Sequence, residues 1–337
     1  MLLSTAQIRS IALGAVRIEE QTDGIHFSRF TAEQDALYSR RSEAQYLRSQ
    51  ASSGIQFRFV TDSKTFSLQA QLLPGSNRSF FSFDVFVNGK KIDSLNNFDG
   101  KEMPPLYPSL SFPLGVFSKE FSLGDGEKEV CVYFPWSVKT VIQTVALDDG
   151  ASLKPVKPGK IALCFGDSIT QGYDATYPSN KYITRLTNML DAQEYNKAIG
   201  GEIFFPELAA TKEDFVPDYI FVSYGTNDHA RCTKEEFLHN CTEFFRNIEK
   251  NYPNIRVFVI TPIWCKTPGA NKPLGEHKNM DRVIRAITAE FPNVTTVRGY
   301  DFVPQDEAFF ADGHLHPNDA GFDHYFENLA KEIRPLL

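Results

Sequence analysis

The sequence predicts an α/β protein of two domains: an N-terminal β-sandwich over residues 1–155 and a C-terminal domain with a parallel sheet over residues 156–337. Three observations predict this division. The chain has 337 residues, which is more than one hydrophobic core usually needs. Its first half shows short alternating runs between turn signals, whereas its second half alternates apolar strands with amphipathic helices. Between the halves, "DDGASLKPVKPGK" has the proline, glycine and lysine content of a linker.

The N-terminal half is a series of short predicted strands. The alternating runs are "GIQFRFV", "TFSLQAQLL", "FFSFDVFVNGKKI", "KEFSL", "KEVCVYFP" and "VIQTVAL". Within the third run, Asn88 and Gly89 indicate a hairpin, because both residues tolerate the positive φ of a type I′ turn. Strands at this spacing favour a jelly-roll-like β-sandwich. The segment up to about Leu47 has no clear pattern, and its structure stays open.

The C-terminal half contains near-continuous apolar runs that predict buried strands. These lie at 160–165, 217–224 and 255–261, with weaker candidates at 194–200 and 293–299. Strands that alternate with helices predict a parallel sheet covered on both faces. In such sheets, ligands bind at the carboxyl ends of the strands.

Two amphipathic helices are predicted between these strands. In the helix over 234–252, the predicted apolar face consists of Phe237, Leu238, Cys241, Phe244, Phe245 and Ile248. In the helix over 278–291, it consists of Met280, Val283, Ile284, Ile287 and Phe291.

Charge and composition exclude several classes of partner. The net charge is −7 and the sequence has no dense basic run, so no nucleic-acid partner is predicted. The N-terminus lacks a basic segment before an apolar core, and no stretch is apolar for the length of a bilayer crossing. The five cysteines are scattered without CxxC spacing, which favours reduced, buried thiols over disulfides or zinc. These features predict a cytoplasmic protein with no membrane partner.

Ser168 ends the sequence "GDS", directly after the strand predicted at 160–165. A serine hydroxyl becomes a nucleophile when a base accepts its proton. At a strand-to-helix junction, the backbone N–H of the same residue is unpaired and lies near a helix N-terminus. Ser168 could therefore supply both an attacking oxygen and an anion-binding donor. Alternatively, Ser168 or Asp167 only caps the helix that begins near Ile169.

Gly201 in "IGGE" and Asn227 in "GTND" follow the next two predicted strands. A glycine lets the backbone approach a substrate closely and present its N–H, and an asparagine amide can donate to a developing oxyanion. Each such donor contributes about 3–4 kcal/mol to transition-state stabilisation in comparable enzymes. Alternatively, the glycines form a tight turn, and Asn227 forms an Asx turn with Asp228 as the cap of the next helix.

His316 lies in "ADGHLHPNDAGF", a loop before the last predicted helix. Asp312, four residues upstream, could orient the ring through Nδ1 and leave Nε2 free for Ser168. Alternatively, His316 is a surface histidine, with Asn318 or the aspartate after it as a helix cap. The nearby His314 also raises the possibility of a metal site, but neighbouring loop histidines need further ligands at defined geometry, so no metal is predicted.

The four stretches together resemble the SGNH/GDSL hydrolase family, which is named for Ser, Gly, Asn and His in separated blocks. They occur in the family's order, as Ser168 in "GDSIT", Gly201 in "NKAIGGE", Asn227 in "GTND" and His316 in "HPNDAG". The resemblance spans residues 160–337. It implies a three-layer α/β/α, flavodoxin-like fold and ester hydrolysis without a cofactor. In that family, Ser168 would be the nucleophile and His316 the base, and the oxyanion hole would be formed by the N–H groups of Ser168 and Gly201 with the Asn227 amide.

One spacing departs from the family pattern. The usual order is Asp-x-x-His, but the third position before His316 is Gly313 and the aspartate is Asp312. An extra residue can be absorbed in a loop, so Asp312 is still the predicted acid of the site. The pentapeptide GxSxG is absent, which argues against the α/β-hydrolase fold.

A β-rich domain before an SGNH domain is similar to the arrangement in certain carbohydrate esterases. This similarity implies a small-molecule or carbohydrate ester as substrate, with removal of an acetyl or other acyl group. Two alternatives stay open: a lipid-acyl or thioester hydrolase of the same family, and a carbohydrate-binding protein whose hydrolase domain is inactive. Oligomeric state cannot be read from the sequence.

The substrate pocket would be shaped by the loops at 224–232 and 262–278, and Tyr224 and Trp264 either line it or only pack beneath it. The many phenylalanines of the N-terminal half either contact a sugar or form the core of the sandwich.

Overall fold

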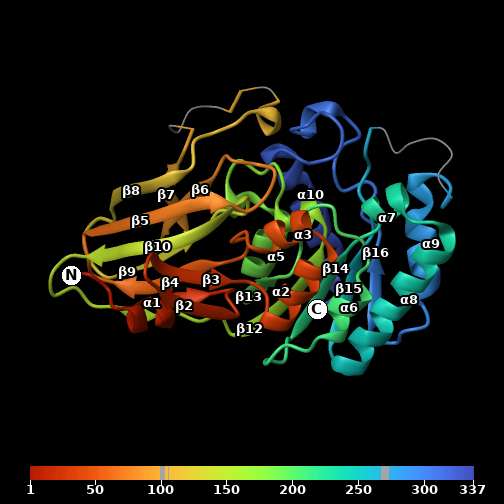
Figure 1. Ribbon diagram of the computed structural model, residues 1–337, viewed down its shortest axis with the longest axis horizontal. Coiled ribbons are helices and arrows are strands. Elements are labelled where there is room, and N and C mark those ends of the chain that lie inside the picture. The colour runs from red at the N-terminus through yellow and green to blue at the C-terminus, as the bar shows by residue number, and fades with distance from the viewer. Residues whose placement is uncertain (99–102, 105, 267–272) are drawn as a thin grey trace.

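The computed structural model describes residues 1–98, 103–104, 106–266 and 273–337. The N-terminal part contains antiparallel sheets and the C-terminal part a parallel sheet, and the two lie side by side (Figure 1). The chain crosses from one to the other between strand β11 (Lys154–Pro155) and strand β12 (Lys160–Gly166). We propose that the two domains divide at residue 155, and the position of this crossing is consistent with that boundary.

Two antiparallel sheets form the N-terminal part. The strands of the first are β1 (Ala12–Leu13), β4 (Gln56–Thr61), β6 (Ser82–Val87), β7 (Lys90–Asn96) and β9 (Lys128–Tyr133). Those of the second are β2 (Arg17–Gln21), β3 (Gly24–Ser28), β5 (Thr65–Pro74), β8 (Gly115–Ser122) and β10 (Val138–Leu147). Their orders are β1-β4-β9-β6-β7, with β11 on β4, and β2-β3-β10-β5-β8. Positive φ angles of 49° at Asn88 and 77° at Gly89 confirm the predicted hairpin between β6 and β7.

The core of this part lies between the two sheets, which confirms a β-sandwich. Every second residue of β5 is buried, from Phe66 to Leu72, because successive side chains of a strand point to opposite faces. Phenylalanines of both sheets meet there, and the rings of Phe27 in β3 and Phe57 in β4 pack edge to face with centroids 5.9 Å apart. These phenylalanines therefore build the core, and the more specific jelly-roll-like connectivity stays a prediction.

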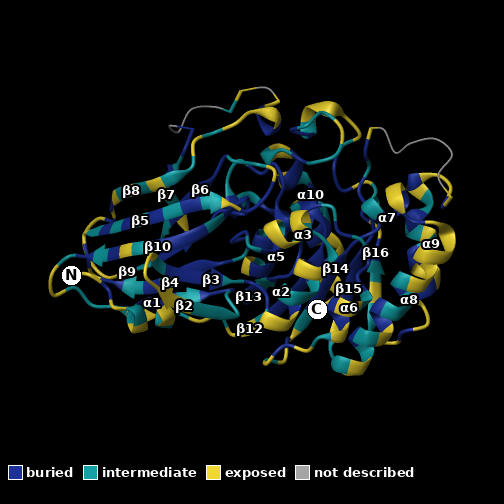
Figure 2. Cartoon of the chain, viewed as in Figure 1, coloured by how far each residue is buried: buried dark blue, intermediate teal, exposed yellow. Residues whose placement is uncertain are grey.

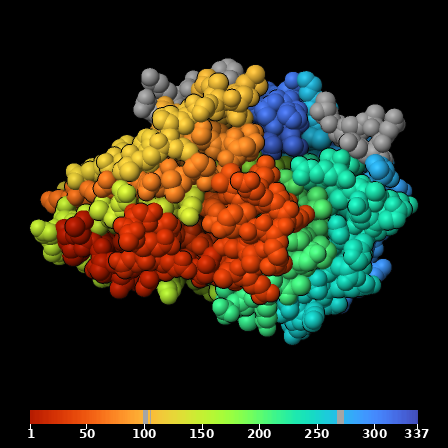
Figure 3. Space-filling model, viewed as in Figure 1, coloured from red at the N-terminus to blue at the C-terminus, as the bar shows by residue number. Residues whose placement is uncertain are grey.

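The segment that the sequence left open forms helices α1 (Thr5–Ile11), α2 (Ala32–Arg41) and α3 (Glu43–Ser49). Ser4 and Thr31 cap α1 and α2 with capping boxes, in which the third helical residue is a glutamine that bonds back to the cap. From α2, the Gln34 side chain donates to Glu213 of the C-terminal part at 2.6 Å. The red-orange surface of this segment lies directly against the green surface of the C-terminal part (Figure 3).

The C-terminal sheet consists of β12, β13 (Ala192–Asn196), β14 (Tyr219–Ser223), β15 (Arg256–Ile260) and β16 (Val294–Val297). All neighbours are parallel, in the order β13-β12-β14-β15-β16. This is the flavodoxin-like order, and it confirms the predicted fold. The order reverses at β12 and β14, so the crevice beyond their carboxyl ends is the expected ligand site.

Helices cover both faces of this sheet, which confirms three layers (Figure 2). One face carries α5 (Tyr182–Met189) and α10 (Asp319–Ile333), and the other carries α6 (Pro206–Ala210), α8 (Lys234–Asn251) and α9 (Met280–Thr288). The short helices α4 (Ser168–Gln171) and α7 (Thr226–Arg231) begin at strand ends. Short 3-10 turns lie at Tyr107–Ser109, Pro178–Asn180, His277–Asn279, Glu307–Phe309 and Arg334–Leu336.

The predicted apolar face of the helix over 234–252 is wrong at one residue. Leu238 of α8 is 36% exposed, whereas Phe237, Cys241 and Phe244 are buried. Successive residues of a helix are rotated by about 100° around its axis. Leu238 therefore lies at the edge of the apolar face, and the three buried residues lie at its centre.

The described part of the chain also answers two predictions from composition. No helix in it combines the length and the apolar character that a bilayer crossing requires. All five cysteines are buried and unpaired, as the scattered spacing predicts.

Candidate active site

Ser168 is the first residue of α4, at the carboxyl end of β12. The Asp167 carboxylate accepts the Ile169 N–H at 3.0 Å, so Asp167 and not Ser168 caps the helix. The turn before Ser168 requires glycine at position 166, because a Cβ there would lie only 2.4 Å from the Thr170 hydroxyl oxygen. Burial raises the pKa of Asp167 to about 6. The Ser168 hydroxyl is thus left free of the capping role.

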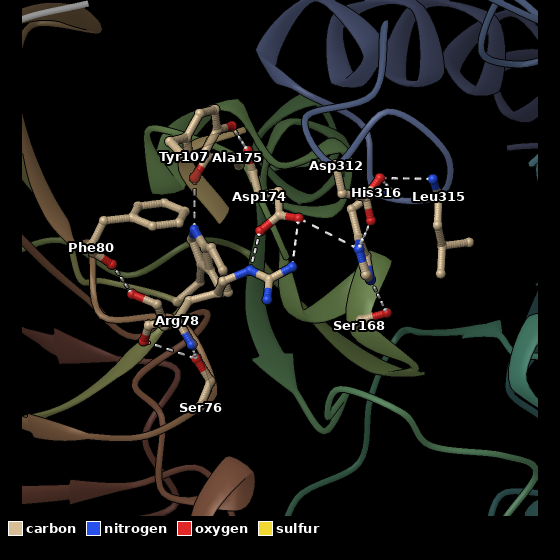
Figure 4. Close-up of polar contacts among 12 residues, drawn as sticks. Ser76, Arg78, Phe80, Tyr107, Ser168, Asp174, Ala175, Asp312, Leu315 and His316 are labelled. Atoms are coloured by element: carbon tan, nitrogen blue, oxygen red, sulfur yellow. Dashed lines mark hydrogen bonds and ion pairs between the residues drawn. The ribbon is translucent and has the colours of Figure 1, made fainter. Parts of the chain in front are cut away.

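The structure brings His316 and Asp312 to this serine (Figure 4). The distance from His316 Nε2 to Ser168 Oγ is 2.9 Å, and the distance from His316 Nδ1 to Asp312 Oδ2 is 2.7 Å. Ser168 follows the first strand of the sheet, whereas the other two lie in the loop before α10. These contacts have the geometry of an activated serine.

The loop itself explains the extra residue between Asp312 and His316. The second carboxylate oxygen of Asp312 accepts the backbone N–H groups of His314, Leu315 and His316 at 3.1, 2.8 and 3.1 Å. Gly313 has φ +74°, the left-handed conformation that glycine adopts at low cost. The backbone therefore wraps around the carboxylate, and the spacing of four still places the Oδ2 atom on the imidazole.

The two groups shift each other's pKa. Burial alone would raise the pKa of Asp312, but hydrogen bonds from His316 and from the loop N–H groups hold it well below its usual range. Burial alone would lower the pKa of His316, but the hydrogen bond with Asp312 and the negative charges of Asp174 and Asp312 raise it above its ordinary value. The two carboxylates therefore stabilise the imidazolium form of His316 more than water does.

The second block is held by side chains on both sides of Gly201. The carbonyl of Gly200 accepts from Arg48 Nη1 at 2.9 Å, and the carbonyl of Gly201 accepts from Arg231 Nη1 at 2.7 Å. Because a trans peptide points its C=O and N–H in opposite directions, the bond from Arg48 fixes the direction of the Gly201 N–H. Among the described residues, no hydrogen bond engages the N–H of Gly201 or of Ser168.

Asn227 lies in α7, which Gly225 caps with φ +119°. Its amide nitrogen donates to the carbonyl of Glu202 at 3.0 Å, so it bridges the second and third blocks instead of forming an Asx turn. The Asp228 carboxylate accepts the N–H groups of Gly225 and Phe204, each at 3.0 Å. Burial raises the pKa of Asp228 to about 7. Asp228 thus fastens the loops that carry Gly201 and Asn227.

Two charged residues of the site were not predicted from the sequence. Asp174 Oδ2 lies 3.4 Å from His316 Nδ1, and the Arg78 guanidinium pairs with both oxygens of Asp174 at 2.7 and 3.0 Å. Asp174 lies six residues after Ser168 in the same block, and this proximity is the one sequence feature that could have indicated its place in the site. Arg78 comes from the N-terminal domain, 96 positions earlier, and no motif connects it to the site.

Asp174, Asp312 and His316 also have ligand-type atoms within 4.8 Å of one another. Their partners are protein groups: Arg78 supplies a positive charge to Asp174, and the two ring nitrogens of His316 face Asp312 and Ser168. The ring of His314 turns back to the carbonyl of Asp312 at 2.9 Å. We therefore interpret this cluster as an ion-pair network.

A cavity of about 230 Å³ adjoins this site. It is lined by Thr226, Asn227, His229, Ala230, Cys265, His277, His314 and Leu315. Most of these side chains are polar. A larger cavity of about 650 Å³ lies between α1 and the β2–β3 turn, and none of the predicted site residues lines it.

The predicted pocket residues have different positions. Tyr224 is 1% exposed and packs between Phe204 and Phe244, so its burial fits the predicted alternative in which it packs beneath the pocket. Trp264 is partly buried against Phe310, and its role in substrate binding stays a prediction. Residues 267–272 of the loop predicted to shape the pocket lie outside the described residues.

Comparison with known proteins identifies the family of this domain. Residues 164–324 match the sequence profile of the GDSL-like lipase/acylhydrolase family. This segment belongs to that family. The GDSL domain is therefore a hydrolase domain, as the four blocks predict. No curated protein sequence matches the chain.

Solved structures similar to this chain cover nearly all of its length. A salicylyl-acyltransferase from a tetracycline biosynthetic pathway is 18% identical with a TM-score of 0.76, over 96% of this chain and 94% of that one. A GDSL-like lipase from Bacteroides ovatus is 16% identical with a TM-score of 0.75, over 100% and 97%. A family two carbohydrate esterase from Clostridium thermocellum, solved with cellohexaose, is 14% identical with a TM-score of 0.67, over 96% and 98%. At these identities the likeness shows a shared fold for the sandwich and the GDSL domain together.

Proposed function

We propose that this protein is a serine esterase that hydrolyses a carboxylic ester through an acyl-serine intermediate, and that it deacetylates an O-acylated carbohydrate or a similar small ester. The observation that carries the proposal is the continuous contact from Ser168 through His316 to Asp312, with distances of 2.9 and 2.7 Å. In this proposal the three residues are nucleophile, general base and orienting acid.

In the first step, Ser168 Oγ attacks the ester carbonyl while its proton passes to His316 Nε2. Asp312 holds the Nδ1–H and stabilises the imidazolium, whose raised pKa reflects that stabilisation. The tetrahedral intermediate then expels the alcohol, which takes the proton from His316. The acyl group stays on Ser168 as an ester.

The oxyanion of that intermediate would accept hydrogen bonds from the N–H groups of Ser168 and Gly201 and from the Asn227 amide. The two backbone donors are unengaged by other described residues, which supports this assignment. Donors that are already oriented stabilise the charge without reorganising, and loss of one costs about 3–4 kcal/mol in comparable enzymes.

In the second step, His316 takes a proton from water, and the resulting hydroxide attacks the acyl-serine. The carboxylic acid leaves, and Ser168 recovers its proton from His316. Every proton that moves is held by His316, so the mechanism requires no cofactor.

A short acyl group is favoured over a long one by the cavity beside Asn227. Its volume is about 230 Å³, and imidazole and amide groups line it. Among the described lining groups, the buried Nε2 atom of His277 has no hydrogen-bond partner, and a long apolar acyl chain would leave it unsatisfied. The carbohydrate part of the proposal is supported by the two-domain fold that the chain shares with a cellohexaose-bound carbohydrate esterase.

The proposal is tested by hydrolysis of p-nitrophenyl acetate by the wild type and by Ser168→Ala, with acetyl and octanoyl esters compared. We expect turnover of the acetyl ester that depends on Ser168, and release of acetate from an acetylated oligosaccharide. Preference for octanoyl would favour the lipid-acyl or thioester alternative. Glycan binding without labelling of Ser168 by a fluorophosphonate would favour the inactive carbohydrate-binding alternative.

The cytoplasmic location, which the unpaired thiols support, is tested by cell fractionation.

A further inference from the structure

His316 faces a second carboxylate besides Asp312. The side chain of Asp174 is fully buried, and its Oδ2 lies 3.4 Å from His316 Nδ1 on the side opposite to Ser168. Asp174 has φ +69°, a conformation that costs a non-glycine residue free energy. A buried charge in that conformation requires strong partners elsewhere.

The N-terminal domain supplies those partners (Figure 4). The Arg78 guanidinium forms a bidentate pair with the Asp174 carboxylate at 2.7 and 3.0 Å. The Tyr107 hydroxyl donates to the backbone carbonyl of Asp174, and the Trp136 indole N–H donates to the next carbonyl along the chain at 2.8 Å. Side chains of the sandwich therefore hold both the backbone and the carboxylate of Asp174.

Arg78 is itself fixed on the sandwich side. Its backbone N–H donates to Ser76 Oγ at 3.0 Å, and its guanidinium lies over the Tyr173 ring at 5.5 Å from the centroid. The Tyr173 ring in turn contacts the His316 ring, with centroids 5.4 Å apart. A continuous path of packed and charged groups thus leads from the β5–β6 loop to the imidazole.

The charges around His316 come from three parts of the chain. The titratable and charged groups that face it are Asp312 from its own loop, Asp167, Tyr173 and Asp174 from the first block, and Arg78 from the N-terminal domain. Asp174 stabilises the imidazolium, and Arg78 opposes it. The two members of the pair therefore act on His316 with opposite sign.

We infer that Asp174 and Arg78 are a positioning pair, through which the N-terminal domain sets the orientation and the basicity of His316. The inference rests on the proposed function, in which His316 is the general base. It gives the β-sandwich a role in the reaction itself, in addition to any contact with substrate.

The opposite signs make the test specific. General base catalysis requires the neutral imidazole, so kcat/KM falls as the pH falls through the pKa of His316. Asp174→Asn removes a negative charge, and we expect the acid limb to move to lower pH by about one unit. Asparagine also tolerates the left-handed conformation. Arg78→Gln leaves Asp174 without its counter-charge, and we expect the limb to move to higher pH. Arg78→Lys keeps the charge and should return the limb towards the wild-type position.

The experiment measures kcat/KM for p-nitrophenyl acetate against pH and, independently of turnover, the titration of the His316 ring by NMR. Asp84→Asn is the matched control, because Asp84 is also fully buried and also joins the domains, through Ser179 at 2.6 Å, and has no contact with His316 among the described residues. The acid limb of the kcat/KM profile of Asp84→Asn should coincide with that of the wild type.

The inference would be overturned if the acid limbs of Asp174→Asn and the wild type coincide. It would also be overturned if the limbs of Asp174→Asn and Arg78→Gln move in the same direction. If Arg78→Gln does not fold, Asp174→Asn and Arg78→Lys still decide it. Turnover that survives Ser168→Ala would instead refute the proposed function, and the NMR titration would still report whether Asp174 sets the pKa of His316.

Discussion

The change of Asp312 to asparagine tests the part of the site where the sequence departs from the family spacing. One carboxylate oxygen of Asp312 accepts three backbone N–H groups, and the other accepts from His316 Nδ1. The single oxygen of an asparagine will keep the three backbone bonds, so its NH₂ group will face the ring. The amide then favours the tautomer that carries its proton on Nε2, and in that tautomer Nε2 cannot accept the proton of Ser168.

We expect Asp312→Asn to reduce kcat for p-nitrophenyl acetate by roughly 10³-fold at pH 7, equivalent to about 4 kcal/mol in activation free energy. The loss is smaller than the ~10⁴-fold effect of the corresponding change in trypsin-like triads, because Asp174 still offers a carboxylate to Nδ1 at 3.4 Å. Addition of Asp174→Asn should remove this remaining support and lower kcat further.

The assay is steady-state hydrolysis, with circular dichroism to verify that the variant folds. A folded Asp312→Asn enzyme that retains kcat within about tenfold of the wild type would refute the reasoning, since the tautomer argument predicts a far larger loss.

Two further predictions concern a contact between the domains and a buried ion pair within the C-terminal part. Arg48→Met removes the donor that orients the Gly201 peptide, and we expect kcat to fall by roughly tenfold with little change in KM, a fraction of what loss of a whole oxyanion donor costs; an unchanged kcat would contradict this role. Lys197 and Glu213 form a buried pair at 2.8 Å, so Lys197→Met should lower the free energy of unfolding by roughly 3–5 kcal/mol, measured by urea denaturation. Glu213→Gln combined with Lys197→Met should recover part of that loss, and a double variant no more stable than the single one would argue against an unpaired charge as the cause.

Much of the fold could be predicted because local patterns decide it. The run "KIALCF" is apolar throughout, and the strand β12 has Leu163 facing one helical layer and Cys164 facing the other. The hairpin at Asn88 follows from the backbone conformations that its two residues allow. By contrast, helices α2 and α3 of the segment that the sequence left open contact the C-terminal part, through Gln34 and Arg48, and no local pattern shows these contacts.

The site divides in the same way. Ser168 and His316 could be named from local motifs, and the structure brings them to 2.9 Å. Asp174 and Arg78 could not, because their pairing depends on how two domains pack across 96 positions of sequence. Tyr224 follows a strand, and this position alone allows either a pocket residue or one packed beneath the pocket; its ring lies in the core beside Phe204.

The central claim is that Ser168 is the nucleophile of an ester hydrolysis. The most direct measurement is mass spectrometry of the protein after reaction with a fluorophosphonate, alongside p-nitrophenyl acetate turnover by the same samples. The account predicts a single adduct on the peptide that contains Ser168, loss of turnover in proportion to labelling, and neither adduct nor turnover in Ser168→Ala. Turnover that persists in Ser168→Ala, or in fully labelled wild type, would contradict it.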